Sequence, residues 1–311
     1  MAFTVVPLRH LRLPLGTKIP FAPDFFLEDL PLWVKEDKGT LTDLSLNERE
    51  AILDGRHAFV SQYDAASIGQ PDFEWPKESR RSIQKSKSEN AILANLAIWL
   101  QHPSPVSFTT VLHAIQVIQS VESQQLPLLC LASDLPSHLN ENDISKAGEL
   151  YAVIRRIQRT NSAWTAMRAL WAALTTNQID IRYSLLWISL EALLGDEDGG
   201  EIIHKIAERI ALFLASTPTE ARQLFHKAKN SYSMRSKIVH GRYYDDPKIN
   251  QLMADTEAII RDAFRHLLHN PELLKTFTSK KSRNEYLGDL IFSRIKHLGP
   301  LLTDDPSLRS G

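Results

Sequence analysis

The sequence has one cysteine, Cys130, in 311 residues, so no disulfide can form within the chain. This favours a reducing compartment and excludes every zinc site that needs two or more cysteines from one chain. An excess of charge is also lacking, because 36 lysines and arginines face 37 aspartates and glutamates. Balanced charge excludes a globally basic nucleic-acid coat but leaves room for a local basic patch.

Long apolar runs are missing as well. No stretch reaches the roughly 18 apolar residues of a membrane span, and the first residues, MAFTVVPLRHLRLPLG, have no basic start before their apolar run. The chain also has no glycine-rich phosphate loop, no nucleophile elbow and no histidine pair with metal-ligand spacing. We therefore expect a soluble cytoplasmic protein that uses neither a membrane, a cofactor nor a metal.

Proline placement and helical periodicity divide the chain near residue 140. Residues 1–45 contain five prolines among short apolar runs, which predicts strands and loops. The segment 45–63, SLNEREAILDGRHAFVSQY, has the pattern of an amphipathic helix with Ser45 or Asn47 as its N-cap. A second helix is expected over 80–100, whereas 108–118 suits a strand or a helix. Residues 1–140 thus form a mixed α/β region that carries no recognisable motif.

The rest of the chain is predicted to be almost entirely helical. Residues 141–300 would form one helical bundle, followed by a polar tail over 301–311. The fold class is therefore mainly α, with a helical bundle preceded by a mixed α/β region. The expected helices of the bundle lie over 149–159, 162–174, 181–194, 203–214, 219–232, 252–268 and 283–297.

The segment Tyr232–Gly241, YSMRSKIVHG, carries the most chemistry. Between Arg222 and Tyr244 there are six lysines and arginines and no acidic residue, which makes a local patch suited to phosphates. Arg235 can donate to two phosphate oxygens, and His240 can transfer protons near neutral pH. Gly241 predicts that a helix stops there, with His240 near an exposed end.

The spacing of these two residues leaves two interpretations open. Five positions on an ideal helix are about 140° apart, so Arg235 and His240 converge only if the helix turns or breaks between them. Otherwise the segment is a capped helix end whose cations complement the helix dipole.

The run SMRSKIVHG, preceded by helices that contain SLEALLG and IAERIALFL, resembles the HEPN domain (higher eukaryotes and prokaryotes nucleotide-binding), most closely its Apea-like branch. The resemblance extends over residues 149–269. It implies a metal-independent endoribonuclease, in anti-phage defence or toxin-like growth arrest, that works as a homodimer. In such a protein residues 1–140 would sense a trigger or bind a partner such as an antitoxin. It further implies that Arg235 and His240 are the catalytic pair, that Ser236 is the polar residue after the arginine, and that Glu191 supports them.

The residue types suit RNA cleavage through the ribose 2′-hydroxyl. His240 would transfer a proton, Arg235 would stabilise the developing charge, and DNA would resist. Toxin members of the family often have a tyrosine two positions after the histidine, where this chain has Arg242. Two alternatives remain: a non-catalytic HEPN module that binds RNA or nucleotide, and a dimeric scaffold. The residues expected to contact RNA are Lys229, Lys237, Arg242 and Tyr243.

Overall fold

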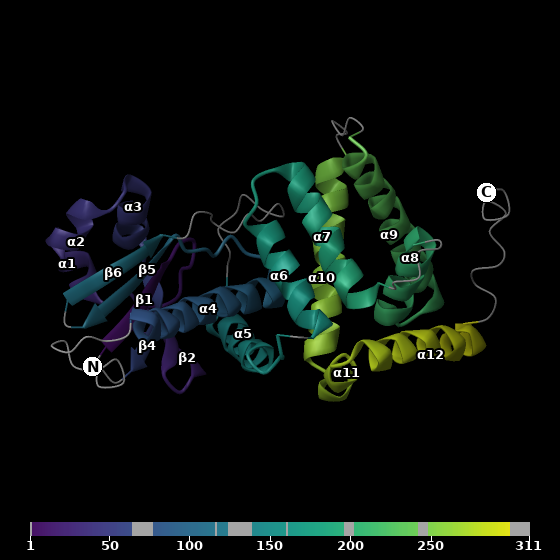
Figure 1. The fold of residues 1–311 in the computed structure, drawn as a ribbon, viewed down its shortest axis with the longest axis horizontal. Coiled ribbons are helices and arrows are strands. Elements are labelled where there is room, and N and C mark those ends of the chain that lie inside the picture. The colour runs from purple at the N-terminus through teal and green to yellow at the C-terminus, as the bar shows by residue number, and fades with distance from the viewer. Residues whose placement is uncertain are drawn as a thin grey trace. The chain divides into compact units, whose positions relative to one another are not determined.

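The computed structural model shows two compact units, Met1–Arg156 and Ile157–Gly311 (Figure 1). Each unit is described by itself. The structure describes residues 2–63, 77–115, 117–123, 139–159, 161–195, 202–241 and 248–298.

A six-stranded antiparallel sheet forms the centre of the first unit, with the strand order β2-β3-β4-β1-β5-β6. Its middle strands β4 and β1 pair in antiparallel register from Ala2 opposite Tyr63 to Leu8 opposite His57. The segment 108–118, which suited either a strand or a helix, contributes β5. The strands are β1 (Ala2–Leu8), β2 (Lys18–Ala22), β3 (Phe25–Asp29), β4 (His57–Tyr63), β5 (Thr110–Ile115) and β6 (Val117–Ser123).

The single helix expected over 45–63 is wrong in its second half. Helix α3 covers only Leu46–Asp54, where Ser45 and Glu48 form a reciprocal capping box, and Gly55 ends it. The chain then enters β4, whose first five residues are buried on both faces of the sheet. Hydrogen bonding to two neighbouring strands and burial on both faces outweigh a helical period that is weak in this segment.

Helices cover both faces of this sheet. On one face Val5, Val60 and Leu112 form a core with Val34 and Ile52, which come from α1 (Leu32–Glu36) and α3; α2 (Lys38–Asp43) lies between these two helices in the chain. On the other face an aromatic cluster joins strands β2, β3 and β4 to Tyr151 of α5 (Glu141–Ile154), and α5 also packs against α4 (Lys77–Gln101). The expected mixed α/β character of this region is confirmed.

Helix α5 also determines where the first unit ends. The sequence suggested a division near residue 140, but the units separate between Arg156 and Ile157. The reason is that α5 packs on β2 and α4 rather than on the later helices.

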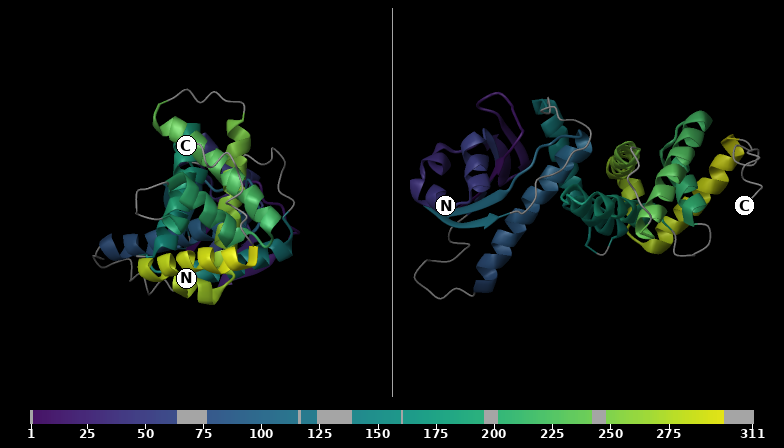
Figure 2. Two further views of the ribbon diagram at one scale, coloured as in Figure 1. Left: turned by 90° about the vertical axis from the view of Figure 1, so that its right-hand side faces the viewer. Right: turned by 90° about the horizontal axis from the view of Figure 1, so that it is seen from above.

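The described part of the second unit is helical throughout, so the fold class is mainly α with a small antiparallel sheet in the N-terminal region. Helices α7, α9 and α10 pack against one another, and α8 packs along α9 (Figures 1 and 2). Helix α6 has the predicted bounds, whereas α9 continues seven residues past the expected end at Tyr232, and α11 was not expected. The helices are α6 (Ser162–Leu174), α7 (Ile179–Leu194), α8 (Ile202–Leu214), α9 (Pro218–Val239), α10 (Ile249–Leu268), α11 (Pro271–Thr276) and α12 (Lys280–Leu298).

Among the residues that the structure describes, no helix combines the length and apolar character that crossing a membrane requires.

Candidate functional site

Helix α9 carries the segment that the sequence singled out. It begins at Pro218 behind the N-cap Thr217, whose side chain accepts a hydrogen bond from the Glu220 N–H, and it is unbroken to Val239. His240 is the C-cap residue, and Gly241 follows with a φ of 66°. The predicted helix stop at Gly241 is therefore confirmed, because the left-handed backbone there favours glycine.

A buried network of hydroxyl groups fixes α9 against its neighbours. Tyr183 of α7 donates to the Ser231 carbonyl oxygen at 2.8 Å, and Trp187 donates to the Ser231 Oγ at 3.3 Å. The same Oγ is hydrogen-bonded to Thr256 of α10. Since Ser231 is fully buried, these contacts set the position of α9 one helical turn before Arg235.

Arg235 and Glu191 meet between α9 and α7. The Arg235 Nη2 lies 3.5 Å from the Glu191 Oε1, and the two side chains are 23% and 28% exposed. Tyr232 completes this cluster, because its hydroxyl donates to the same Glu191 oxygen at 2.9 Å and the Arg235 guanidinium carbon lies 5.3 Å from its ring centroid. The sequence interpretation missed Tyr232, although its position three residues before Arg235 places both on one helical face.

The environment of Tyr232 raises its pKa to about 12. Burial is the largest cause, the hydrogen bond to Glu191 and the negative charge of Glu191 act in the same direction, and Arg235 opposes them. The phenol is therefore a hydrogen-bond donor to Glu191 across the neutral range. Its ring is fixed by an edge-to-face contact with Trp187 at 4.8 Å between centroids.

His240 lies on another side of α9 from Arg235. Because the helix has no break between them, the five intervening steps separate the two residues by about 140° around the axis. Arg235 faces Glu191, whereas His240 is exposed at the helix end and donates its backbone N–H to the Ser236 carbonyl oxygen at 3.2 Å. One chain thus brings together Arg235 and Glu191, and it places half-buried Ser236 about 40° from His240.

The residues expected to contact RNA divide into two groups. Lys237 is exposed in the last turn of α9, and Lys229 is half-buried with its Nζ 5.9 Å from the Phe225 ring centroid. Arg242 and Tyr243 lie outside the residues that the structure describes.

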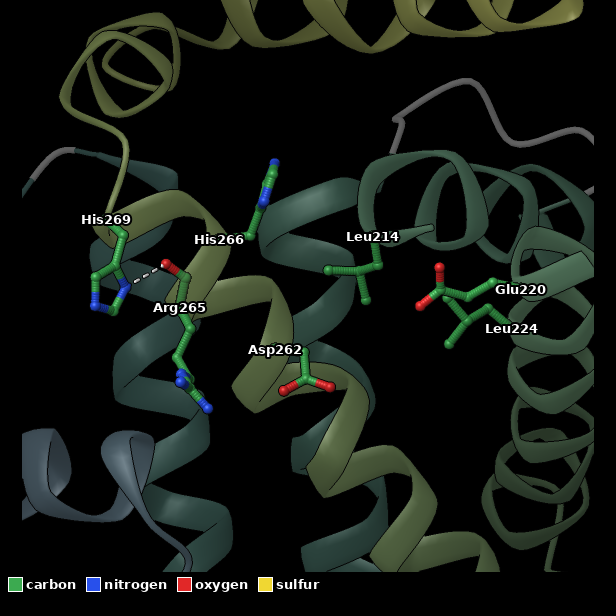
Figure 3. A pocket seen from close by; sticks show the side chains of 7 residues that line it. All are labelled: Leu214, Glu220, Leu224, Asp262, Arg265, His266 and His269. Carbon is green, nitrogen blue, oxygen red and sulfur yellow. Dashed lines mark hydrogen bonds between the residues drawn. The ribbon is translucent and has the colours of Figure 1, made fainter. Parts of the chain in front are cut away.

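A cleft of about 440 Å³ lies at the opposite end of α9, between that end, the end of α8 and the second half of α10 (Figure 3). In Figure 3 Asp262 and Glu220 approach it from opposite sides. Glu220 accepts the Ser216 N–H at 2.7 Å and so belongs to the start of α9. None of the candidate site residues lines the cleft, and we assign it no part in the candidate site.

Within the described segments, no three histidine, cysteine, aspartate or glutamate residues are grouped so that they could hold a metal ion. Comparisons of the chain with protein-family models, with curated proteins and with solved structures found no match.

Proposed function

We propose that the protein is a cytoplasmic, metal-independent endoribonuclease of HEPN type that acts in anti-phage defence or toxin-like growth arrest. The observation that supports this best is the pair of functional groups that α9 presents. Arg235 is oriented by Glu191 and Tyr232, and His240 is exposed five residues later at the helix end. The resemblance of RSKIVHG to the HEPN motif supplies the reaction class.

In this proposal His240 transfers the proton of the ribose 2′-hydroxyl, and the 2′-oxygen attacks the adjacent phosphorus. The bond to the 5′-oxygen breaks, that oxygen takes a proton from water, and the proton held by His240 returns to solvent, so the products are a 2′,3′-cyclic phosphate and a 5′-hydroxyl. Arg235 stabilises the negative charge of the pentacoordinate intermediate. Ser236 offers a hydroxyl on the same side of α9 as His240. DNA resists because it has no 2′-hydroxyl.

In this proposal a second copy of the chain completes the cleavage site. Arg235 and His240 lie about 140° apart on α9, so a cleavage site that uses both takes the arginine from one protomer and the histidine from the other. Exposed apolar side chains support a homodimer near this site. Val239, next to His240, is 53% exposed, and Ile188, one turn before Glu191 on α7, is 41% exposed.

The first test is cleavage of single-stranded RNA in the presence of a chelator by the wild type, Arg235→Ala and His240→Ala. Loss of the histidine removes a proton-transfer contribution of roughly 10²–10⁴ in rate. Cleavage of the matching DNA, or cleavage that both variants retain, would overturn the proposal.

Mixing the two inactive variants tests the shared site. A randomly mixed population of Arg235→Ala and His240→Ala should regain about a quarter of the wild-type rate, because half of the dimers are mixed and each mixed dimer keeps one intact site of two. If both residues acted within one chain, mixing would restore nothing. Each variant mixed with itself is the control.

The separation of Arg235 from His240 also favours a second candidate, a HEPN module that binds RNA without cleaving it. In that case all three proteins bind RNA in the same assay and none releases a cyclic phosphate product. Dimerisation without RNA binding would indicate a scaffold.

A further inference from the structure

The outer face of α9 carries a row of basic side chains that runs the length of the helix. Arg222, His226, Lys229, Lys237 and His240 are separated by four, three, eight and three positions. These steps keep all five within about 80° of the helix circumference. We call this row the α9 basic stripe.

The stripe faces solvent along almost all of its length. Four of its members are exposed and Lys229 is half-buried. The gap between Lys229 and Lys237 is filled on the same side by exposed Asn230, whose amide can donate hydrogen bonds, and by exposed Ser233, whose hydroxyl donates to the Lys229 carbonyl oxygen. The buried residues of α9 lie on the other side, so the stripe is the face that α9 turns away from its own unit.

The stripe differs from the other cations of α9 in its pairing. Lys227, on another side of the helix, lies 2.9 Å from Asp255, and Arg235 lies 3.5 Å from Glu191. Within the described part of the chain, no stripe residue pairs with a carboxylate. Stabilisation of the helix dipole explains only Lys237 and His240, since the effect fades beyond the last turn. Arg222, His226 and Lys229 lie beyond its reach.

We propose that the α9 basic stripe binds the phosphate backbone of single-stranded RNA and leads the strand to His240. From Arg222 to His240 the helix rises about 27 Å, at 1.5 Å per residue. One narrow row of basic side chains matches one backbone, whereas double-stranded RNA is bound across successive grooves. Lysine and arginine side chains that face solvent can neutralise phosphates with release of counterions.

This inference rests on the proposed function and adds the path of the substrate. His226 and Arg222, which the sequence interpretation did not single out as RNA contacts, become contacts far from the cleaved bond. Arg235 lies off the stripe, so it contributes to cleavage and not to the track along α9.

The test uses the full chain and a fluorescein-labelled 2′-O-methyl oligouridylate of about 12 nucleotides, a length within the range of single-stranded sites. The 2′-O-methyl group prevents attack, so binding is measured without cleavage. The stripe variant is Arg222→Gln/Lys229→Gln/Lys237→Gln. The matched control is Lys227→Gln/Lys275→Gln/Lys281→Gln, which removes the same charge from other exposed positions.

At a salt concentration of about 0.1 M, we expect the stripe variant to bind the oligonucleotide about tenfold more weakly than the wild type, or weaker still. The control variant should bind as the wild type does. The slope of log K against log salt should fall by about 2 in the stripe variant, since each phosphate contact of a single strand contributes about 0.7. Equal losses in both variants, no loss in the stripe variant, or no binding by the wild type would overturn the stripe.

Two further arms separate this proposal from others. Binding that depends on the stripe, without cleavage of unmodified RNA, would support the stripe and contradict the nuclease. Cleavage of RNA by the stripe variant with an unchanged KM would support the nuclease and contradict the stripe. If polyglutamate of equal charge displaces the oligonucleotide with the same affinity and the same stripe dependence, an acidic protein is the partner and the RNA proposal fails.

Discussion

The Tyr232 hydroxyl and the Arg235 guanidinium share one acceptor, the Glu191 Oε1, at 2.9 and 3.5 Å. The phenol of Tyr232, on α9, is the closer donor and holds the Glu191 carboxylate of α7 in place. That carboxylate in turn orients the Arg235 guanidinium. Tyr232 is therefore a positioning residue for Arg235.

A double-mutant cycle measures this relationship. Tyr232→Phe keeps the ring against Trp187 but removes the donor, Glu191→Gln removes the charged acceptor, and the double variant removes both. Because the Glu191 side chain is partly exposed, we expect a coupling free energy of about 1 kcal/mol in urea unfolding of the second unit. Additive effects, within roughly 0.5 kcal/mol, would show that the two groups do not interact.

Stability at high pH should depend on the same phenol. The fold raises the pKa of Tyr232 to about 12, whereas an unfolded tyrosine ionises near 10. The folded chain thus holds this proton where the unfolded chain has lost it, so Tyr232 lowers stability as pH rises from about 10 to 12. In unfolding curves across this window, wild type should lose more stability than Tyr232→Phe. Parallel curves for the two proteins would contradict the raised pKa.

Ser231 provides a test of how α9 is anchored. Ser231→Ala removes the hydroxyl that contacts Tyr183, Trp187 and Thr256, all in a buried site, and we expect a loss of roughly 1–3 kcal/mol in unfolding free energy. Ser233→Ala is the matched control, since Ser233 is exposed two residues later and its hydroxyl donates only to the Lys229 carbonyl oxygen of its own helix. Equal losses in the two variants would mean that the buried network does not stabilise α9.

The sequence predicted the helices best where one apolar period dominates. Helix α6 has its predicted bounds, and α7, α8 and α10 begin within three residues of theirs, since their apolar faces pack in a helical unit. Strand β4 was missed because the pairing of His57–Tyr63 with β1 and β3 depends on residues far along the chain. No local pattern contains that information.

The candidate site was predicted in its residues but not in its geometry. The motif identified Arg235, His240 and Glu191, and the structure brings Arg235 to Glu191, the residue to which the resemblance gave a supporting role. Gly241 predicted the helix stop, but the helix expected over 219–232 did not reach it, because Ser231, Ser233 and Ser236 weaken the helical pattern after residue 230. Burial of Ser231 against Tyr183 compensates for that low propensity.

A buried ion pair joins α7 to α10 and should be costly to break. The Arg182 Nη2 lies 2.6 Å from the Glu257 Oε1, and both side chains are at most 5% exposed. Burial raises the pKa of Glu257, and the positive charge of Arg182 acts against that shift. Glu257→Gln removes the charge that faces Arg182 and should cost roughly 3–5 kcal/mol, whereas Arg182→Met/Glu257→Met should cost less than the two single variants combined. Thermal and urea unfolding measure both, and a mild effect of Glu257→Gln would show that the pair is accessible to water.

The end of α9 depends on a backbone conformation that only glycine adopts easily. Gly241 has a φ of 66°, and a Cβ built there meets no atom within 4 Å, so the cost of Gly241→Ala is conformational and not steric. We expect Gly241→Ala to lose about 1 kcal/mol of unfolding free energy, and Gly241→Asn to lose less, since asparagine tolerates the left-handed region better.

Gly288→Ala is the control. Gly288 lies within α12, also with no atom within 4 Å of its Cβ position, and there alanine should stabilise the helix by roughly 0.5–1 kcal/mol. Effects of the same sign at the two positions would contradict the left-handed cap that ends α9 at His240.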